Sequence, residues 1–163
     1  MSEMCIVESR WFFSHVEIIR GPDDMAKKSS CVEFVLDGRH FALPLENVKE
    51  IISRPEITPL PMASKHVRGI INLRGDVIPV VDLSVRLGGV DVNMDRSEIL
   101  VLVIDGLIAG VMVDSASQVS ELDTGNMKDL DSSANLDRSV VQGVLRHGDQ
   151  LVIFLDAASI LSV

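Results

Sequence analysis

The chain has 163 residues, which is enough for one domain or two very small ones with a real hydrophobic core. It is 47% hydrophobic but only 4% aromatic, so the core must be built mainly from Val, Ile and Leu. The net charge is −9, and residues 97–163 carry most of it, with 3 basic and 10 acidic groups. This excess of negative charge argues against nucleic acid or an anionic membrane surface as a partner.

No apolar run approaches the roughly 20 residues that span a bilayer, so we expect no direct membrane insertion. Charged residues scattered through the N-terminus exclude a signal peptide. Cys5 and Cys31 are isolated and form neither a CxxC motif nor a disulfide framework. These features predict a cytoplasmic protein.

Residues 1–30 are interpreted as an N-terminal extension. They contain the only Trp, Trp11, followed by a Gly21-Pro22 break and a polar stretch. Trp11, His15 and Ile18 would share one face of a helix, but Met25 could equally be a natural start. The sequence leaves both readings open.

From Cys31 the pattern favours strands. The runs CVEFVL and HFALPL flank Asp37-Gly38, which is typical of a β-hairpin. Residues 48–52 continue as a strand or a short turn, and three prolines mark the loop that follows. A central hairpin is then predicted over residues 67–83, with its turn around Gly75-Asp76 and a short helix over 83–87.

The second half shows the same kind of pattern. Strands are predicted over residues 99–104 and 107–113, on either side of Asp105-Gly106. Residues 121–137 are polar and acidic and are expected to form a loop. A last hairpin over residues 140–155 and a short helix over 157–161 complete the chain.

The two halves resemble each other. The segment from Val35 matches the segment from Val103 at a constant offset of 68 residues. The central hairpin matches residues 141–161 at offsets of 73 to 74 with one indel, which aligns Gly75 with Gly148 and Asp82 with Asp156. The repeat predicts an all-β fold of two five-stranded barrels, about 31–90 and 91–163, with short helices.

No catalytic motif is found. The chain lacks GxxxxGK, GxGxxG, GxSxG and HExxH, and its four histidines have no i,i+4 partner and no neighbouring Cys. Asp82 and Asp156 precede the two short helices, where an N-cap role is simpler than an acid–base pair. We therefore expect no enzyme activity, no metal and no cofactor.

Several segments together resemble one family. PLENVKEI, the Pro-rich loop, GIINLRGDVIPVVDL, GVMVD and the final hairpin are similar to the CheW-like chemotaxis adaptors, over about residues 32–161. The resemblance implies two SH3-like barrels of five strands and no catalysis. It also implies a scaffold that couples chemoreceptor cytoplasmic tips to the regulatory domain of the histidine kinase CheA, at membrane receptor arrays.

By position, the resemblance places receptor binding near the groove between the barrels, and it assigns no kinase-binding residue. The receptor-binding positions would be Val48, Glu50, Ile51, Gly69, Arg74 and Gly75. We expect Glu50 and Arg74 to form an ion pair, and Val48, Ile51 and the Arg74-Gly75 turn to form a mostly apolar docking patch. Two alternatives remain: these residues only hold a barrel together, or the groove serves a small enzyme or ligand-binding protein.

Overall fold

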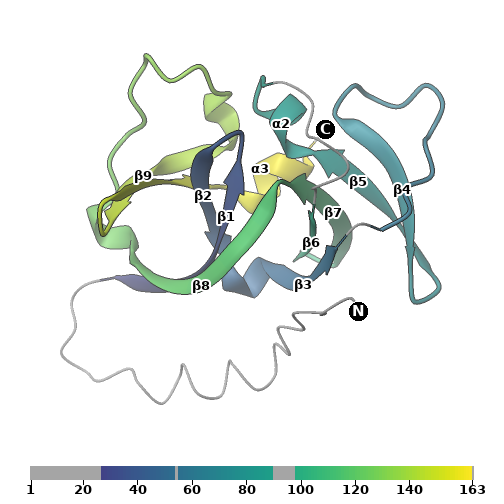
Figure 1. Ribbon diagram of the computed structural model, residues 1–163, viewed down its shortest axis with the longest axis horizontal. Helices are drawn as coiled ribbons and strands as arrows, with labels where there is room; N and C mark the ends of the chain where they lie inside the picture. Colours follow the sequence, from purple (N-terminus) through teal and green to yellow (C-terminus); the bar gives the residue numbers. More distant parts are fainter. Residues whose placement is uncertain (1–26, 54, 90–97, 163) are drawn as a thin grey trace.

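The computed structural model describes residues 27–53, 55–89 and 98–162 (Figure 1). This part of the chain contains ten strands and only short helical segments. The strands are β1 (Lys28–Leu36), β2 (Arg39–Pro44), β3 (Val48–Ser53), β4 (Val67–Leu73), β5 (Asp76–Asp82), β6 (Glu98–Ile104), β7 (Leu107–Val113), β8 (Ser115–Asp123), β9 (Val141–His147) and β10 (Gln150–Leu155). The helical segments are η2 (Leu45–Asn47), α2 (Leu83–Arg86), η3 (Thr124–Asn126), η4 (Arg138–Val140) and α3 (Ala157–Leu161).

The strands form two five-stranded sheets, which confirms the predicted all-β class. One sheet has the order β3-β6-β7-β5-β4, and we call it the first barrel. The other has the order β8-β1-β2-β10-β9, and we call it the second barrel; in Figure 1 it curls into a ring. Backbone bridges join the segments after β3 and β8 to the far edges of their own sheets, at Thr58–Ile70 and Lys128–Val144. These bridges close both sheets.

The expected division of the barrels near residue 90 is wrong. β6 and β7 belong to the first barrel, and β1 and β2 belong to the second. After β2, the short η2 segment leads β3 away to pair with β6, and after β7 the chain crosses in the same way to pair β8 with β1. Each sequence repeat therefore gives its first two strands to one barrel and its other three strands to the other.

The internal repeat itself is visible in the turns. The Asp37-Gly38 turn has φ angles of 50° and 72°, and the Asp105-Gly106 turn has φ angles of 50° and 82°. Two consecutive positive φ angles define a type I′ turn, which matches the right-handed twist of the flanking strands. The two turns predicted to be equivalent thus have the same backbone conformation.

The later hairpins correct one detail of the alignment. Leu73 pairs with Asp76 across the first turn, and His147 pairs with Gln150 across the second, so both turns contain two residues. The offset therefore stays at 74 throughout this part of the repeat. The expected indel is absent, and Gly75 corresponds to Asp149 rather than to Gly148.

The core has three parts. The largest cluster lies between the barrels and includes Phe34 and Leu155 from the second barrel and Leu100 and Val111 from the first. Two smaller clusters lie within the individual barrels. The other barrel does not cover the outer face of β5, because Val77 is 63% exposed, Pro79 is exposed, and only Val81 on that face is buried.

β1 begins at Lys28, so the expected extension of residues 1–30 overlaps the first strand by three residues. Residues 1–26, including the predicted helical face at Trp11, lie outside the described part of the chain.

Candidate functional site

The turn between β4 and β5 brings three of the six predicted binding residues together. Arg74 Nη2 donates a hydrogen bond to Glu50 Oε2 at 3.2 Å, which confirms the predicted ion pair. The Glu50 side chain is only 11% exposed, whereas that of Arg74 is 65% exposed. Gly75 donates its N–H to Asn72 Oδ1 at 2.9 Å, which fixes the turn. We call Arg74, Gly75 and the exposed Val77 that follows them the turn corner.

Glu50 faces the interior of the first barrel. Ile52, two residues further along β3, packs against the cluster inside that barrel, and alternate residues of a strand share a face. Arg74 therefore reaches across the end of the barrel to the buried carboxylate. Glu50 Oε1 is buried and has no hydrogen-bond partner among the described residues, so the carboxylate depends largely on Arg74.

The other three predicted residues do not join the turn corner. Val48 is 2% exposed and belongs to the cluster between the barrels, so it cannot be a surface anchor, and its place in the docking patch is wrong. Ile51 is half-buried and packs against the same cluster. The expected apolar patch is therefore split, because Ile51 and Glu50 point to opposite faces of β3.

Gly69 has a structural reason to be glycine. A Cβ atom at this position would lie 2.1 Å from the carbonyl oxygen of Thr58, the residue that bridges to Ile70. Gly143, its counterpart in the repeat, lies beside the equivalent bridge, and a Cβ there would lie 2.9 Å from the Lys128 carbonyl oxygen. Both glycines let a neighbouring segment approach closely enough to close a barrel.

The second barrel holds a similar ion pair that sequence reasoning missed. Glu33 of β1 is buried, and its Oε1 lies 2.9 Å from His147 Nδ1 at the end of β9. Gln118 Nε2 also donates to this oxygen, at 3.5 Å. The available signal was the single carboxylate in the apolar run CVEFVL. Glu50 with Arg74 in the first barrel and Glu33 with His147 in the second thus each pair a buried carboxylate with a basic side chain near a hairpin turn.

Asp82 and Asp156 act as helix caps, as predicted. Asp82 accepts a hydrogen bond from the Val85 N–H, and Asp156 accepts one from the Ala158 N–H. Asp82 also pairs with Arg68 at 2.8 Å. These bonds occupy both carboxylates structurally and leave no arrangement typical of an acid–base pair.

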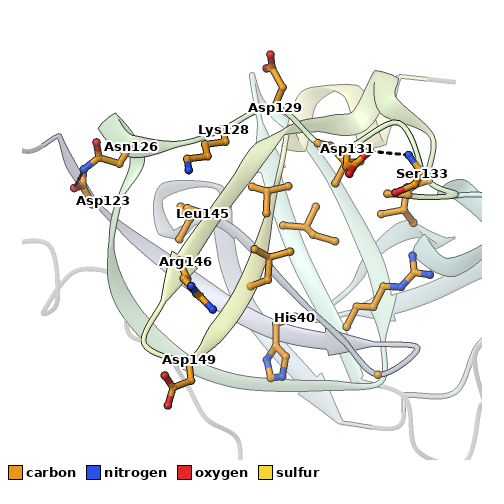
Figure 2. A pocket seen from close by; sticks show the side chains of 18 residues that line it. His40, Asp123, Asn126, Lys128, Asp129, Asp131, Ser133, Leu145, Arg146 and Asp149 are labelled. Carbon is orange, nitrogen blue, oxygen red and sulfur yellow. Dashed lines mark hydrogen bonds between the residues drawn. The ribbon is translucent and has the colours of Figure 1, made fainter.

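The large apolar cluster fills most of the space between the barrels and leaves a cavity of about 440 Å³ beside α2, so the alternative of a small enzyme in an inter-barrel cleft is not favoured. A cavity of about 1030 Å³ lies instead on the second barrel, beneath the loop between β8 and β9 (Figure 2). We call it the second-barrel groove. None of the six predicted residues lines it, and the 18 that do are Gly38, Arg39, His40, Asp123, Asn126, Lys128, Asp129, Leu130, Asp131, Ser133, Ala134, Leu136, Val144, Leu145, Arg146, Asp149, Leu151 and Ile153.

The groove does not have the arrangement of an active site. The hydrogen bond drawn in Figure 2 joins Asp131 to Ser133, which are close neighbours on the same loop. Asp131 accepts hydrogen bonds from Ser133, and these lower the pKa of its carboxyl group, so it stays ionised and is not suited to donate a proton near pH 7. No group of three potential metal ligands occurs in the described part of the chain.

The described part of the chain is thus a pair of closed β-barrels that share one apolar core. The sequence profile of the CheW-like domain matches residues 30–163, so the chain belongs to the CheW-like domain family. Within the described residues, no helix is long and apolar enough to cross a membrane.

Individual relatives agree with this assignment. The chain is 30% identical to the chemotaxis protein CheW of Thermotoga maritima, over 85% of this chain and 91% of that protein. It is 29% identical to the chemotaxis protein CheW of Rhizobium meliloti, over 79% and 84%. The crystal structure of the scaffolding protein TtCheW from Thermoanaerobacter tengcongensis superposes with a TM-score of 0.75 at 28% identity, over 83% of this chain and 94% of that one.

Proposed function

We propose that the chain is a non-enzymatic scaffold adaptor that couples chemoreceptors to the histidine kinase CheA in chemotaxis-type signal transduction. Membership of the CheW-like family supports this function. The proposed place of action is the cytoplasm, at receptor arrays to which the adaptor is recruited.

The observation that carries the proposal is the turn corner. It lies in the family-like segment NLRGDVIPVVDL, and it presents an exposed Arg74 held over a buried carboxylate. One guanidinium donor is used by Glu50, and the exposure of the side chain leaves other donors available to a partner. Val77, which is 63% exposed, adds an apolar contact beside them.

A receptor tip that is a helical hairpin fits this surface. A helix that docks on a protein needs apolar anchors surrounded by polar groups, and Val77 and Arg74 offer one of each. Because Glu50 restrains Arg74, less side-chain entropy is lost when a partner binds. Gly75 has no side chain, so it allows the partner's backbone to approach the turn.

The test is a pull-down of the full chain with a receptor cytoplasmic tip and, separately, with the CheA regulatory domain. We expect both to bind. Arg74→Ala and Val77→Asp should each weaken receptor binding by at least tenfold and leave kinase binding unchanged. Leu107→Asp is the matched control, because Leu107 is 68% exposed beside a different turn and should tolerate the change.

Two results would contradict the proposal at different levels. If the parent chain binds neither partner, the adaptor function is wrong. If the folded Arg74 and Val77 variants bind receptor as well as the parent, the adaptor function stands but the turn corner is not the receptor site. Substitution of Val48 is unsuitable here, because a charge at that buried position would unfold the core.

A further inference from the structure

The second-barrel groove lies beneath the loop between β8 and β9 and leaves part of its apolar floor open to solvent in the described part of the chain. Leu151 of β10 is 61% exposed there, and Leu130 and Leu136 of the overlying loop are half-buried. Figure 2 shows labelled charged side chains, among them Lys128, Asp129 and Asp149, on several sides of the groove. A concave apolar floor surrounded by polar groups is typical of a site that receives apolar side chains.

The start of the described chain is fastened at the rim of this groove. The Lys27 carbonyl accepts hydrogen bonds from the Thr124 N–H at 3.0 Å and from Thr124 Oγ1 at 2.6 Å. Thr124 lies between Asp123 and Asn126, which both line the groove. The residues that precede Lys27 in the sequence are therefore tethered beside the groove.

Residues 1–26 contain suitable apolar side chains. They include Trp11, Phe12 and Phe13, which are three of the six aromatic residues of the chain. The other three have their side chains buried in the cores of the described part, and they are Phe34, Phe41 and Phe154.

The stretch of chain between Trp11 and Lys27 is long enough to reach the groove and short enough to keep Trp11 concentrated near it. Fifteen residues lie between Trp11 and Lys27, and an extended chain spans up to about 3.5 Å per residue, so reach is not limiting. A flexible linker of this length averages about 20 to 25 Å from end to end and gives an effective concentration on the order of 1 mM. Even weak apolar docking would then be substantially populated.

We propose that the Trp11-Phe12-Phe13 segment docks on the apolar floor of the second-barrel groove of the same chain. The groove is then an interaction surface with an internal occupant, which any other apolar partner must displace. This inference does not depend on the proposed adaptor function, since the turn corner belongs to the other barrel.

Charge does not determine this contact. The rim carries Arg39, Lys128 and Arg146 but also aspartates such as Asp129 and Asp149, and residues 1–26 contain five acidic and two basic residues. Docking should therefore change by less than twofold between about 50 mM and 500 mM salt, unlike an electrostatic contact.

Trp11 provides a direct assay, because it is the only Trp in the chain. The experiment measures acrylamide quenching of Trp11 fluorescence in the full chain and in a free peptide of residues 1–26. We expect the quenching constant in the full chain to be at least threefold lower. Leu151→Glu should return it to within twofold of the peptide value. Leu107→Glu, an equally exposed apolar position outside the groove, should leave it unchanged.

The alternatives give different results. Equal quenching in the peptide and the parent chain would refute docking. Protection that survives Leu151→Glu would place Trp11 elsewhere and refute the groove as the site. Protection that disappears on dilution would mean that the segment binds a second copy, which refutes the intramolecular contact. Circular dichroism of both variants verifies that the barrels remain folded.

Discussion

Replacing Gly69 with Ala should open the first barrel. The new Cβ would lie 2.1 Å from the Thr58 carbonyl oxygen and 2.8 Å from its carbonyl carbon, distances that real Cβ atoms do not reach. Both atoms belong to the backbone, so no side-chain rotation relieves the clash. The segment around Thr58 must move away, and with it the bridge that closes the barrel.

The magnitude follows from what this movement breaks. Two backbone hydrogen bonds are lost, from Thr58 N to Ile70 O at 2.8 Å and from Ile70 N to Thr58 O at 2.9 Å. Each contributes about 1 kcal/mol to the free energy of unfolding. The φ angle of +152° adds about 1 to 3 kcal/mol of strain for a residue with a Cβ. The expected loss is about 3 to 5 kcal/mol, a large part of the roughly 5 to 15 kcal/mol of a typical domain.

Urea unfolding followed by circular dichroism measures this loss. Gly75→Ala is the control, because Gly75 also has a positive φ, of 94°, but nothing lies within 4 Å of its added Cβ. It should lose only about 1 kcal/mol. If Gly69→Ala is no less stable than Gly75→Ala, the close approach of Thr58 is not what requires glycine. A loss of receptor binding in Gly69→Ala would then need a direct contact to explain it.

Three further predictions concern single groups. Arg74→Ala should lower the free energy of unfolding by about 1 to 3 kcal/mol, because it leaves the buried Glu50 carboxylate without its partner, and a loss below about 0.5 kcal/mol in urea would contradict this. Asp156→Ala should cost about 1 kcal/mol by the same assay, through loss of the α3 cap, whereas Asp156→Asn should cost less. Burial, with a smaller contribution from Glu33, raises the pKa of Cys31 to about 12, so its stabilising contribution is complete below pH 9 and is lost between pH 9 and 12. Cys31 should resist thiol alkylation at pH 8 in the folded protein and react in urea. The measurement uses the Cys5→Ala variant, so that Cys31 is the thiol that is alkylated.

Local features could be predicted from the sequence because their causes are local. Asp-Gly between two apolar runs favours a two-residue hairpin turn in any context, and both such turns have the expected positive φ angles. Asp before a short helix favours an N-cap, and both caps are present. The Glu50–Arg74 pair was also predictable, since a lone carboxylate and a lone cation in apolar strands each need a partner.

The exchange of strands between the barrels, in which β1 and β2 join the second barrel and β6 and β7 join the first, could not be predicted. The local sequence pattern predicts a strand but not the strand with which it pairs. The short segment from Leu45 to Asn47 suits a return to β2 as well as a crossing to β6. The Glu33–His147 pair was hidden for a similar reason, since its partners are 114 residues apart in the chain. The burial of Val48 depends on a register shift between Val48 and Glu50, which places Val48 on the same face as Ile51.

The strand exchange makes the two barrels one folding unit. β1 and β2 complete the second barrel only with strands from beyond residue 114, and β6 and β7 complete the first only with strands that precede them. The largest cluster also draws on both barrels, so neither can open without exposing apolar surface of the other.

We therefore predict a single cooperative transition for the full chain. Hydrogen exchange should give the same opening free energy for the amides of Val101 in the first barrel and Val152 in the second. Gly69→Ala acts only on the first barrel but should lower both values equally. If it lowers the value at Val101 and leaves Val152 unchanged, the barrels unfold independently, and the strand exchange does not couple them.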